Sequence, residues 1–250
     1  MAGVNIRGLS KTYYIKGAPI LALADVDLDV ADGSFVTIVG KSGCGKSTLL
    51  RLICGLEPMT TGKIEFMSEG KSGNCVRARV NMVFQEPRLM PWLTVEQNVA
   101  VALIQETNIQ QSKTTVNKFL DMMGLMKFKD AYPSQISSGM AQRVALGRML
   151  CYNPDLILMD EPFGALDTFM RRNLQKLLMD IFKEQKKTIL FVTHDVDEAV
   201  FLGQKVVIIE GGRIHRQVPV NLPYPRDLTS HAFFQLREDI IGTIMRQEDI

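Results

Sequence analysis

A glycine-rich run that could bind phosphate lies between an apolar segment and a helical segment. It matches the pattern GxxxxGK[ST], follows the apolar residues 34–39 and opens a helix predicted over 46–53. Glycines let the backbone wrap a phosphate with inward N–H groups, and the helix N-terminus adds partial positive charge. The alternative is a glycine-rich turn without a ligand. The run consists of Gly40, Lys41, Ser42, Gly43, Cys44, Gly45, Lys46, Ser47 and Thr48.

Two carboxylates at a predicted strand end could complete a site for phosphate and Mg²⁺. Lys46 would reach the β- and γ-phosphates, and Ser47 would bind Mg²⁺. The apolar residues 156–159 run into Asp160, which would hold Mg²⁺ through water, and Glu161, which would polarise an attacking water as general base. Neighbours on a strand point to opposite faces, so serving one site requires the chain to turn here. An ordinary acidic strand end is the alternative.

The elements that must position these residues alternate between strand and helix. Apolar, β-rich runs predict strands over 34–39, 80–84, 156–159, 188–192 and 206–209. Helical patterns follow several of them, over 46–53, 169–185 and 196–202. Strands that are nearly continuous in apolar character are typical of a parallel sheet covered on both faces. The pattern therefore predicts an α/β fold with a mainly parallel sheet.

Two other regions depart from this alternation. Strand-like segments at 4–13 and 23–30 have no helix between them, which predicts a small antiparallel sheet on one side. Residues 94–150 are mostly helical in pattern, most clearly over 95–105 and 114–122. We interpret them as a helical subdomain inserted in the α/β core.

The composition is that of an average soluble globular protein. The 250 residues are 46% hydrophobic and 22% charged, and the net charge of +2 gives no electrostatic drive toward nucleic acid. No apolar run reaches the length of a membrane span, and the N-terminal residues lack the apolar region of a secretory signal, so we expect neither. Four cysteines and three histidines without CxxC spacing argue against a disulfide framework or a zinc site.

Further motifs make the chain resemble the ATP-binding cassette (ABC) ATPases over essentially its whole length. Gln85 follows the strand at 80–84 as a Q-loop would, and residues 136–143 (ISSGMAQR) are similar to the signature LSGGQxQR. Ala165, Leu166 and Asp167 match a D-loop, and His194 after the strand at 188–192 matches an H-loop. Tyr13 sits where the family has an aromatic that stacks on adenine, although Tyr14 is a competing candidate.

The resemblance implies a role for each of these residues. ATP and Mg²⁺ would be the cofactors. Gln85 would contact a metal-bound water and the attacking water, and His194 would bond the γ-phosphate and hold Glu161 and the water in line. The catalytic set would be Glu161, His194, Lys46 and Gln85, and the metal set Ser47, Gln85 and Asp160. Nucleotide would also contact Tyr13, residues 40–48, Ser137, Gly139 and Asp167.

The signature segment implies a shared site. Ser137 and Gly139 precede a helix predicted over 140–151, and in the family this helix end faces the γ-phosphate bound by the other protomer. Two ATP molecules would then lie between two chains arranged head to tail. Ser138 replaces the first glycine of the signature pair, which would cost about 1 kcal/mol if the position needs a positive φ. We expect the serine to be tolerated.

The resemblance also implies an organisation for the chain. It predicts a P-loop NTPase of the ABC cassette type, with an N-terminal antiparallel β-subdomain and an inserted helical subdomain. One domain would span 1–250, with the α/β core and β-subdomain at about 1–93 and 151–220, the helical subdomain at 94–150 and a tail at 221–250. The polar residues 67–78 predict an exposed loop, and the amphipathic residues 231–247 a terminal helix packed on the core.

A finer resemblance is to the import ATPases for nitrate, sulfonates and taurine. It rests on residues 84–100, 158–167 and 193–202 and on the tail NLPYPRD (221–227). It implies a second copy of the chain and membrane permease subunits that dock near residues 85–92 as partners. An extracytoplasmic solute-binding protein would act indirectly, and nucleic acid would not be a partner. The chain would sit peripherally on the cytoplasmic face of the membrane. Trp92, the single tryptophan, could be an interface residue or a core residue.

Three other functions are weaker. A soluble ABC protein of DNA repair or translation would need a long coiled coil or a second cassette, for which 250 residues leave no room. They also leave none for the regulatory domain of many sugar importers. An ATP-gated clamp with weak hydrolysis would follow if Ser138 impairs catalysis. A small-molecule kinase would not explain the signature segment, Gln85 or His194.

Overall fold

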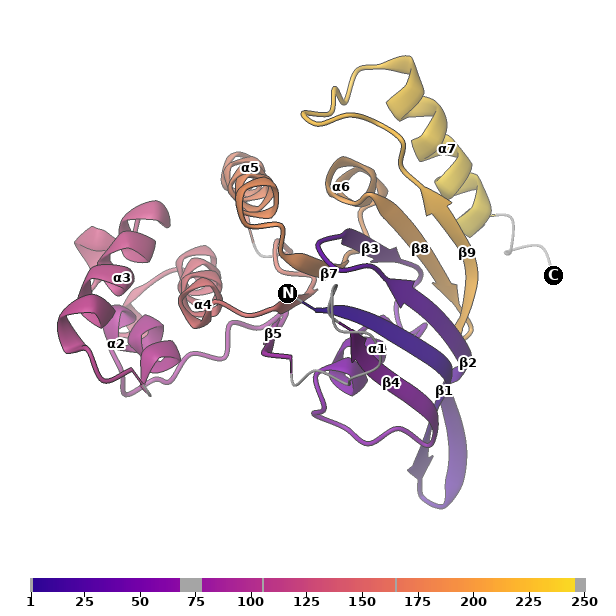
Figure 1. Ribbon diagram of the computed structural model, residues 1–250, viewed down its shortest axis with the longest axis horizontal. Coiled ribbons are helices and arrows are strands. Elements are labelled where there is room, and N and C mark those ends of the chain that lie inside the picture. The colour runs from indigo at the N-terminus through magenta and orange to yellow at the C-terminus, as the bar shows by residue number, and fades with distance from the viewer. Residues whose placement is uncertain (1, 68–77, 105, 165, 246–250) are drawn as a thin grey trace.

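The computed structural model describes residues 2–67, 78–104, 106–164 and 166–245, which form two β-sheets and a helical lobe (Figure 1). The predicted loop at 67–78 therefore lies almost wholly outside the described residues, as does Ala165 of the predicted D-loop. Every strand and helix predicted for the α/β core is present within a residue or two of its predicted bounds.

The N-terminal sheet is antiparallel, as predicted, and has the order β2-β1-β4. Strand β1 (Gly3–Ile15) pairs with β2 (Ala18–Val30) on one side and with β4 (Thr61–Met67) on the other. The sequence reasoning missed β4. Its residues are exposed or half-buried along its whole length, so it has no continuous apolar run to mark it.

The core sheet has the order β5-β6-β7-β3-β8-β9. Its first five strands in that order are parallel, and β9 runs antiparallel to β8 at the edge. Their bounds are β3 Phe35–Val39, β5 Val80–Val83, β6 Leu156–Asp160, β7 Thr188–Val192, β8 Lys205–Glu210 and β9 Arg213–Pro219. All residues of β3, β6 and β7 are buried, which accounts for their continuous apolar character. The mostly exposed edge strand β9 was not predicted.

Helices cover both faces of the core sheet (Figure 1). Helix α1 (Lys46–Ile53) lies between the two sheets, because its leucines pack against both β1 and β2 and the buried face of β6 to β8. On the opposite face, α5 (Thr168–Gln185) packs on β3, β6 and β7. Helices α6 (Val196–Leu202) and α7 (His231–Met245) pack on β3, β8 and one another, which confirms that the terminal helix lies on the core.

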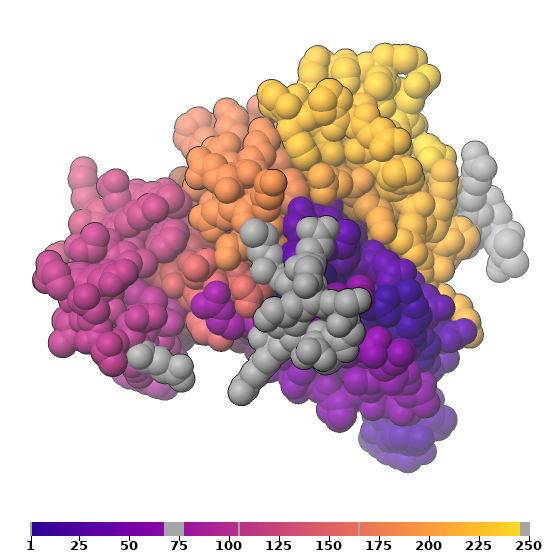
Figure 2. All heavy atoms as spheres, in the orientation of Figure 1, coloured from indigo at the N-terminus to yellow at the C-terminus, as the bar shows by residue number. Residues whose placement is uncertain are grey.

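The helical region forms the lobe drawn in magenta at one side of the molecule (Figure 2). Its elements are α2 Val95–Ala100, η1 Val101–Leu103, α3 Ile109–Met122, η2 Met126–Phe128, η3 Pro133–Gln135 and α4 Ser138–Tyr152. The single helix predicted over 95–105 is instead a short α-helix continued by a 3₁₀ turn, and Gln105 lies outside the described residues. Helix α4 joins the lobe to the core, because its buried residues share one apolar cluster with α5 and β6. The subdomain bounds stay a prediction.

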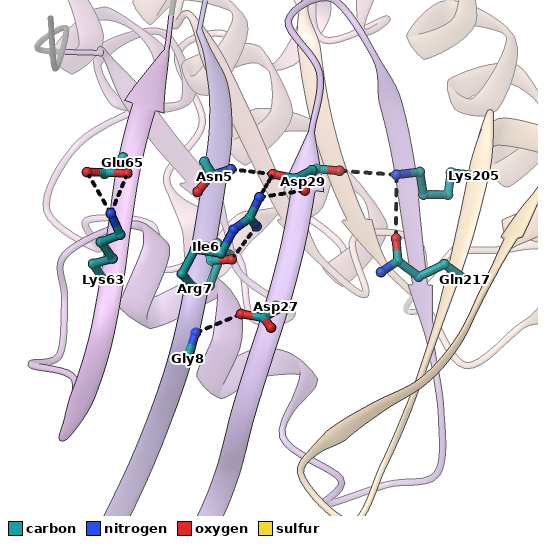
Figure 3. Close-up of polar contacts among 10 residues, drawn as sticks. All are labelled: Asn5, Ile6, Arg7, Gly8, Asp27, Asp29, Lys63, Glu65, Lys205 and Gln217. Carbon is teal, nitrogen blue, oxygen red and sulfur yellow. Dashed lines mark hydrogen bonds and ion pairs between the residues drawn. The ribbon is translucent and has the colours of Figure 1, made fainter. Parts of the chain in front are cut away.

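One aspartate links the two sheets (Figure 3). Both carboxylate oxygens of Asp29 on β2 accept from Arg7 of β1 at 2.8 Å, and Asn5 also donates to this carboxylate. The backbone carbonyl of Asp29 accepts from Lys205 Nζ of β8 at 3.1 Å. The side chains of Arg7 and Asp29 are largely exposed, so the contact fixes alignment more than it adds stability.

The tail motif NLPYPRD fastens the C-terminal end of α6. Arg226 is 6% exposed and donates to the carbonyls of Val200, Phe201 and Gly203, at 3.1 Å for Phe201 and 2.6 Å for Gly203. Its guanidinium also lies 4.2 Å from the ring centroid of Tyr224. The last carbonyls of a helix have no partner inside the helix, so Arg226 supplies the missing donors.

Among the residues that the structure describes, no helix combines the length and apolar character that a membrane crossing would need. The longest is α5, with 18 residues and a charged outer face.

Replacing Arg226 by alanine should destabilise the fold. Several buried carbonyls would lose a charged donor, so we expect the free energy of unfolding in urea to fall by on the order of 3 kcal/mol. Arg213→Ala on the exposed side of β9 is the matched control and should cost less than about 0.5 kcal/mol. Equal effects of the two variants would show that Arg226 does not fasten α6.

Candidate active site

The glycine-rich run forms the turn between β3 and α1, as its position in the sequence predicts. Gly45 is the N-cap of α1 with a φ of 104°, and it has no side chain to bond the first N–H groups of the helix. Lys46 is 6% exposed, and its Nζ donates to the carbonyls of Gly40 at 2.7 Å and Lys41 at 2.9 Å. The ammonium is thus held inside the loop, next to the helix N-terminus, where an anion is favoured.

Two glycines of the loop are required by close backbone approaches. A Cβ on Gly40 would lie 2.1 Å from the carbonyl oxygen of Ile209, and one on Gly45 would lie 2.6 Å from that of Ala22. Both have positive φ values, which side chains disfavour. The loop can therefore keep this tight shape only with glycine at these positions.

The structure brings Ser47 and Asp160 together. Ser47, in the first turn of α1, donates from Oγ to Asp160 Oδ1 at 2.8 Å, although 113 residues separate them in the chain. Asp160 is the last residue of β6 and is 6% exposed. Burial raises the pKa of its carboxyl, and the hydrogen bond from Ser47 opposes the shift. The pair offers two oxygen ligands beside the loop, which suits a hard cation such as Mg²⁺.

The structure also brings Glu161 and His194 together. The chain turns directly after β6, because Glu161 has a φ of 45° and its N–H donates to the carbonyl of Val192 on β7 at 3.0 Å. Glu161 Oε2 then lies 3.0 Å from His194 Nδ1. The turn expected from the sequence is therefore present, and it points the neighbouring carboxylates Asp160 and Glu161 to different partners.

The two tyrosine candidates differ sharply in their surroundings. Tyr14 is 73% exposed near the tip of the β1–β2 hairpin. Tyr13 is half-buried; its hydroxyl donates to Glu57, and Lys11 Nζ lies 4.8 Å from its ring centroid. Burial and the hydrogen bond to Glu57 raise the pKa of the Tyr13 hydroxyl, whereas Thr48, the last residue of the glycine-rich run, lies close enough to lower it. Tyr13 is thus the one that lies beside the loop.

Gln85 is exposed just after β5, at the junction with the helical lobe. The residue before it is tied to that lobe, because Gln142 Nε2 of α4 donates to the carbonyl of Phe84 at 3.2 Å. Gln142 is 1% exposed, and its Oε1 has no partner among the described residues. A shift of α4 would therefore move the backbone next to Gln85.

The structure places Ser137, Gly139 and Asp167 at the starts of two helices. Ser137 caps α4 by accepting from the N–H of Met140 at 3.2 Å, and Asp167 caps α5 by accepting from that of Met170 at 2.9 Å. These capping bonds do not bring Ser137 or Asp167 into contact with Ser47, Asp160, Glu161 or His194. Ser137 and Asp167 are exposed, and a second molecule could therefore reach them.

Comparison with known proteins assigns the chain to a family. The family model described as "ABC transporter" matches residues 23–164, which include the glycine-rich run, the signature segment and Asp160. The chain belongs to the ABC transporter family. It is an ABC ATPase, in which ATP hydrolysis is coupled to transport.

Individual relatives extend over nearly the whole chain. The aliphatic sulfonates import ATP-binding protein SsuB of Bacillus subtilis strain 168 is 40% identical over 99% of this chain and 96% of its own length. An uncharacterised ABC transporter ATP-binding protein of Methanocaldococcus jannaschii, MJ0412, is 42% identical over 96% of this chain and 91% of its own. The ATP-binding cassette MJ0796, solved as a dimer bound to ADP and phosphate, superimposes with a TM-score of 0.79 at 31% identity, covering 87% of this chain and 99% of its own.

Two buried polar residues near the site escaped the sequence reasoning. Gln142 lies inside the signature segment, but only the structure shows that it contacts the chain next to Gln85. Glu198 follows His194 by four residues and is 6% exposed within α6. An acidic residue on the apolar side of a predicted helix is the signal that could have found it.

The serine in the signature segment of this ABC ATPase carries no backbone strain. Ser138 is the first residue of α4 and is absent from the positive-φ residues of the described chain. The premise that this position needs a left-handed conformation is therefore wrong here. The Ser138 side chain is exposed, and the cap of α4 is supplied by Ser137.

Restoring glycine at position 138 should have a small effect. Because Ser138 is helical, we expect Ser138→Gly to change turnover at saturating ATP by less than about tenfold, measured by phosphate release. Ser137→Gly, which removes the α4 cap, is the comparison variant. A gain much above tenfold for Ser138→Gly would show that the natural serine impairs the site.

Proposed function

We propose that this chain is the ATP-hydrolysing, energy-coupling subunit of a membrane importer for a sulfonate-like or nitrate-like solute. The observation that carries the importer class is similarity to an aliphatic sulfonates importer protein over 99% of the chain. The geometry that supports hydrolysis is the pairing of Ser47 with Asp160 and of Glu161 with His194.

The site residues divide the work of hydrolysis. The loop of residues 40–48, which includes Lys46, binds the phosphates, and Tyr13 lies beside the adenine. Glu161 takes a proton as water attacks the γ-phosphorus, and the bond to the bridging oxygen breaks to give ADP and phosphate. With Nδ1 beside Glu161, the ring of His194 keeps Nε2 for the γ-phosphate. Gln85 adds a contact to the attacking water.

The residues present fit Mg²⁺. Ser47 Oγ and Asp160 Oδ1 would hold the ion together with Gln85 and phosphate oxygens, and the ion would neutralise phosphate charge. Within the described residues no group of three His, Cys, Asp or Glu side chains could hold a metal ion by protein ligands alone. Such a partial ligand set is typical of Mg²⁺ that binds with a nucleotide.

A second copy of the chain would complete the site. Ser137 and Gly139 lie at the N-terminus of α4 on the surface, where their N–H groups can reach a phosphate bound by another molecule. Asp167 is exposed at the start of α5. The dimeric state of the related cassette MJ0796 supports this arrangement. ATP binding would close the dimer, and hydrolysis would reopen it.

The loop before α2 supports docking of membrane permease subunits. Trp92 is 71% exposed, so its ring is not part of this chain's core, and Leu89 and Met90 beside it are half-buried. Asn98, fully buried, accepts from the N–H of Met90 at 2.8 Å and donates to the carbonyls of Met90 and Leu93. The loop is thus held in shape, with an aromatic anchor of the kind found at interface hot spots.

Replacing Glu161 by glutamine should separate nucleotide binding from hydrolysis. The amide keeps the shape but cannot accept the proton, so we expect ATP to bind while turnover falls by at least about a hundredfold. The closed dimer should then accumulate and elute early in size-exclusion chromatography with Mg²⁺ and ATP. The same variant with ADP is the control. A chain that binds ATP yet stays monomeric under these conditions would contradict the shared site.

The importer function can be tested with the membrane partners. We expect the chain to co-purify with its permease subunits, and ATP hydrolysis in liposomes with the solute-binding protein to rise on addition of an alkanesulfonate, taurine or nitrate. Trp92→Ala should weaken co-purification about tenfold or more, whereas replacing another exposed aromatic residue, Phe234→Ala on α7, should not. Undetectable hydrolysis with all partners present would contradict the function.

A further inference from the structure

A buried carboxylate next to the active site has no role in the motifs described above. Glu198, in the first turn of α6, is 6% exposed. Its Oε2 accepts from Thr193 Oγ1 at 2.6 Å, and its Oε1 accepts from Gln175 Nε2 of α5 at 2.9 Å. Both oxygens are therefore bonded, and each bond leads to a different element.

The bonds of Glu198 end on both sides of His194. Thr193 precedes the histidine, and its Oγ1, while donating to Glu198, accepts from the N–H of Asp195 at 3.1 Å. Asp195 follows the histidine, and its carboxylate accepts from the N–H of Glu198 at 3.1 Å. Residues 193, 195 and 198 thus close a ring of hydrogen bonds around the backbone that carries His194.

This ring matters because the histidine itself is little constrained. The side chain of His194 is 66% exposed, and its Nδ1 contacts Glu161 Oε2 at 3.0 Å. The position of the ring nitrogen therefore depends on how firmly the backbone of residues 193–195 is held. The N–H of Thr193 also donates to the carbonyl of Ile38 at 3.1 Å, which ties this segment to the strand before the phosphate loop.

We propose that Glu198, together with Gln175, is a positioning residue for ATP hydrolysis. The pair fixes the segment 193–195 so that His194 stays in contact with Glu161 and in line with the γ-phosphate. The proposal rests on the proposed ATPase function and adds two residues to which the motifs gave no role.

The cost of burying this carboxylate favours a specific role. Burial raises the pKa of Glu198, whereas the hydrogen bonds from Thr193 and Gln175 act in the opposite direction. A buried acid without these two donors would be strongly unfavourable, so the arrangement is stable only when both neighbours are in place. An apolar residue would fill the same space at lower cost, but it would leave Thr193 Oγ1 without its acceptor.

Helix α5 supplies a second tie to the same segment. Arg171 lies one turn before Gln175, and its Nη1 is 3.6 Å from Asp195 Oδ2. Both residues thus project from one face of α5 toward the start of α6. Because Asp167 caps the start of α5, this helix links the surface proposed to face a second copy with the segment that holds His194.

Kinetics of three variants test the proposal. Glu198→Ala should lower kcat about ten- to hundredfold, because a displaced His194 no longer holds Glu161. The dissociation constant for ATP of this variant should change less than about threefold. Glu198→Gln should keep most of the turnover. Its amide oxygen can still accept from Thr193, and its NH₂ group can donate to Gln175 once the Gln175 amide rotates to present its oxygen. Gln175→Ala should lower kcat in the same direction, and Asn173→Ala on the exposed side of α5 is its matched control.

A spectroscopic readout distinguishes positioning from stability alone. The chain has only three histidines, so the Cε1–H signals of the ring can be resolved by NMR and that of His194 assigned with His194→Ala. In the native chain, Glu161→Gln should shift the His194 signal, because the two side chains are in contact. This shift should vanish in Glu198→Ala and persist in Glu198→Gln and Asn173→Ala.

Two outcomes would overturn the proposal. The first is native kcat in Glu198→Ala, and the second is a His194 signal that still responds to Glu161→Gln when Glu198 is alanine. Loss of ATP binding in step with kcat would show a structural role only and would also reject it. If the native chain does not hydrolyse ATP at all, the proposed function fails, whereas the NMR test of His194 positioning can still be scored.

Discussion

The turn after β6 is the constraint on which the rest of the site depends. Neighbouring residues of a strand point to opposite faces, so Asp160 and Glu161 could not both serve one site if β6 continued. The left-handed φ of Glu161 ends the strand and is held by a hydrogen bond to Val192 on β7. Asp160 then meets Ser47, and Glu161 meets His194. In the proposed function, the backbone conformation of Glu161 separates the side that would bind Mg²⁺ from the side that would hold the attacking water.

Sheet order turns this local constraint into a site. Strands β6, β7 and β3 are neighbours and parallel, so their carboxyl ends bring the two carboxylates, His194 and the phosphate loop to one edge. Helices on both faces of the sheet contact this edge. Helix α1 carries Ser47 on one face, and α5 and α6 hold residues 193–195 on the other. In the proposed function, the exposed N-terminal end of α4 would complete the site of a second chain, an arrangement that the dimeric relative supports.

The strands of the core and the phosphate loop can be predicted from the sequence. Buried parallel strands are apolar throughout, and a glycine-rich run between a strand and a helix is compatible with few other structures. Prediction from the sequence fails where burial is partial: β4 and β9 lie at sheet edges and carry alternating polar residues, so no apolar run marks them. The backbone conformation of Ser138 could not be inferred from the glycine that the family signature has at this position, because the first residue of a helix needs no positive φ. Glu198 was missed because its partners Thr193 and Gln175 lie on other elements and only packing brings them together.

A crystal structure of the native chain with Mg²⁺ and a non-hydrolysable ATP analogue would show how the turn after β6 divides the site. We expect Mg²⁺ about 2.1 Å from Ser47 Oγ on the Asp160 side, while Glu161 keeps its contact with His194 beside the γ-phosphate. Direct coordination of the metal by Glu161, or His194 turned away from both Glu161 and the phosphate, would contradict it.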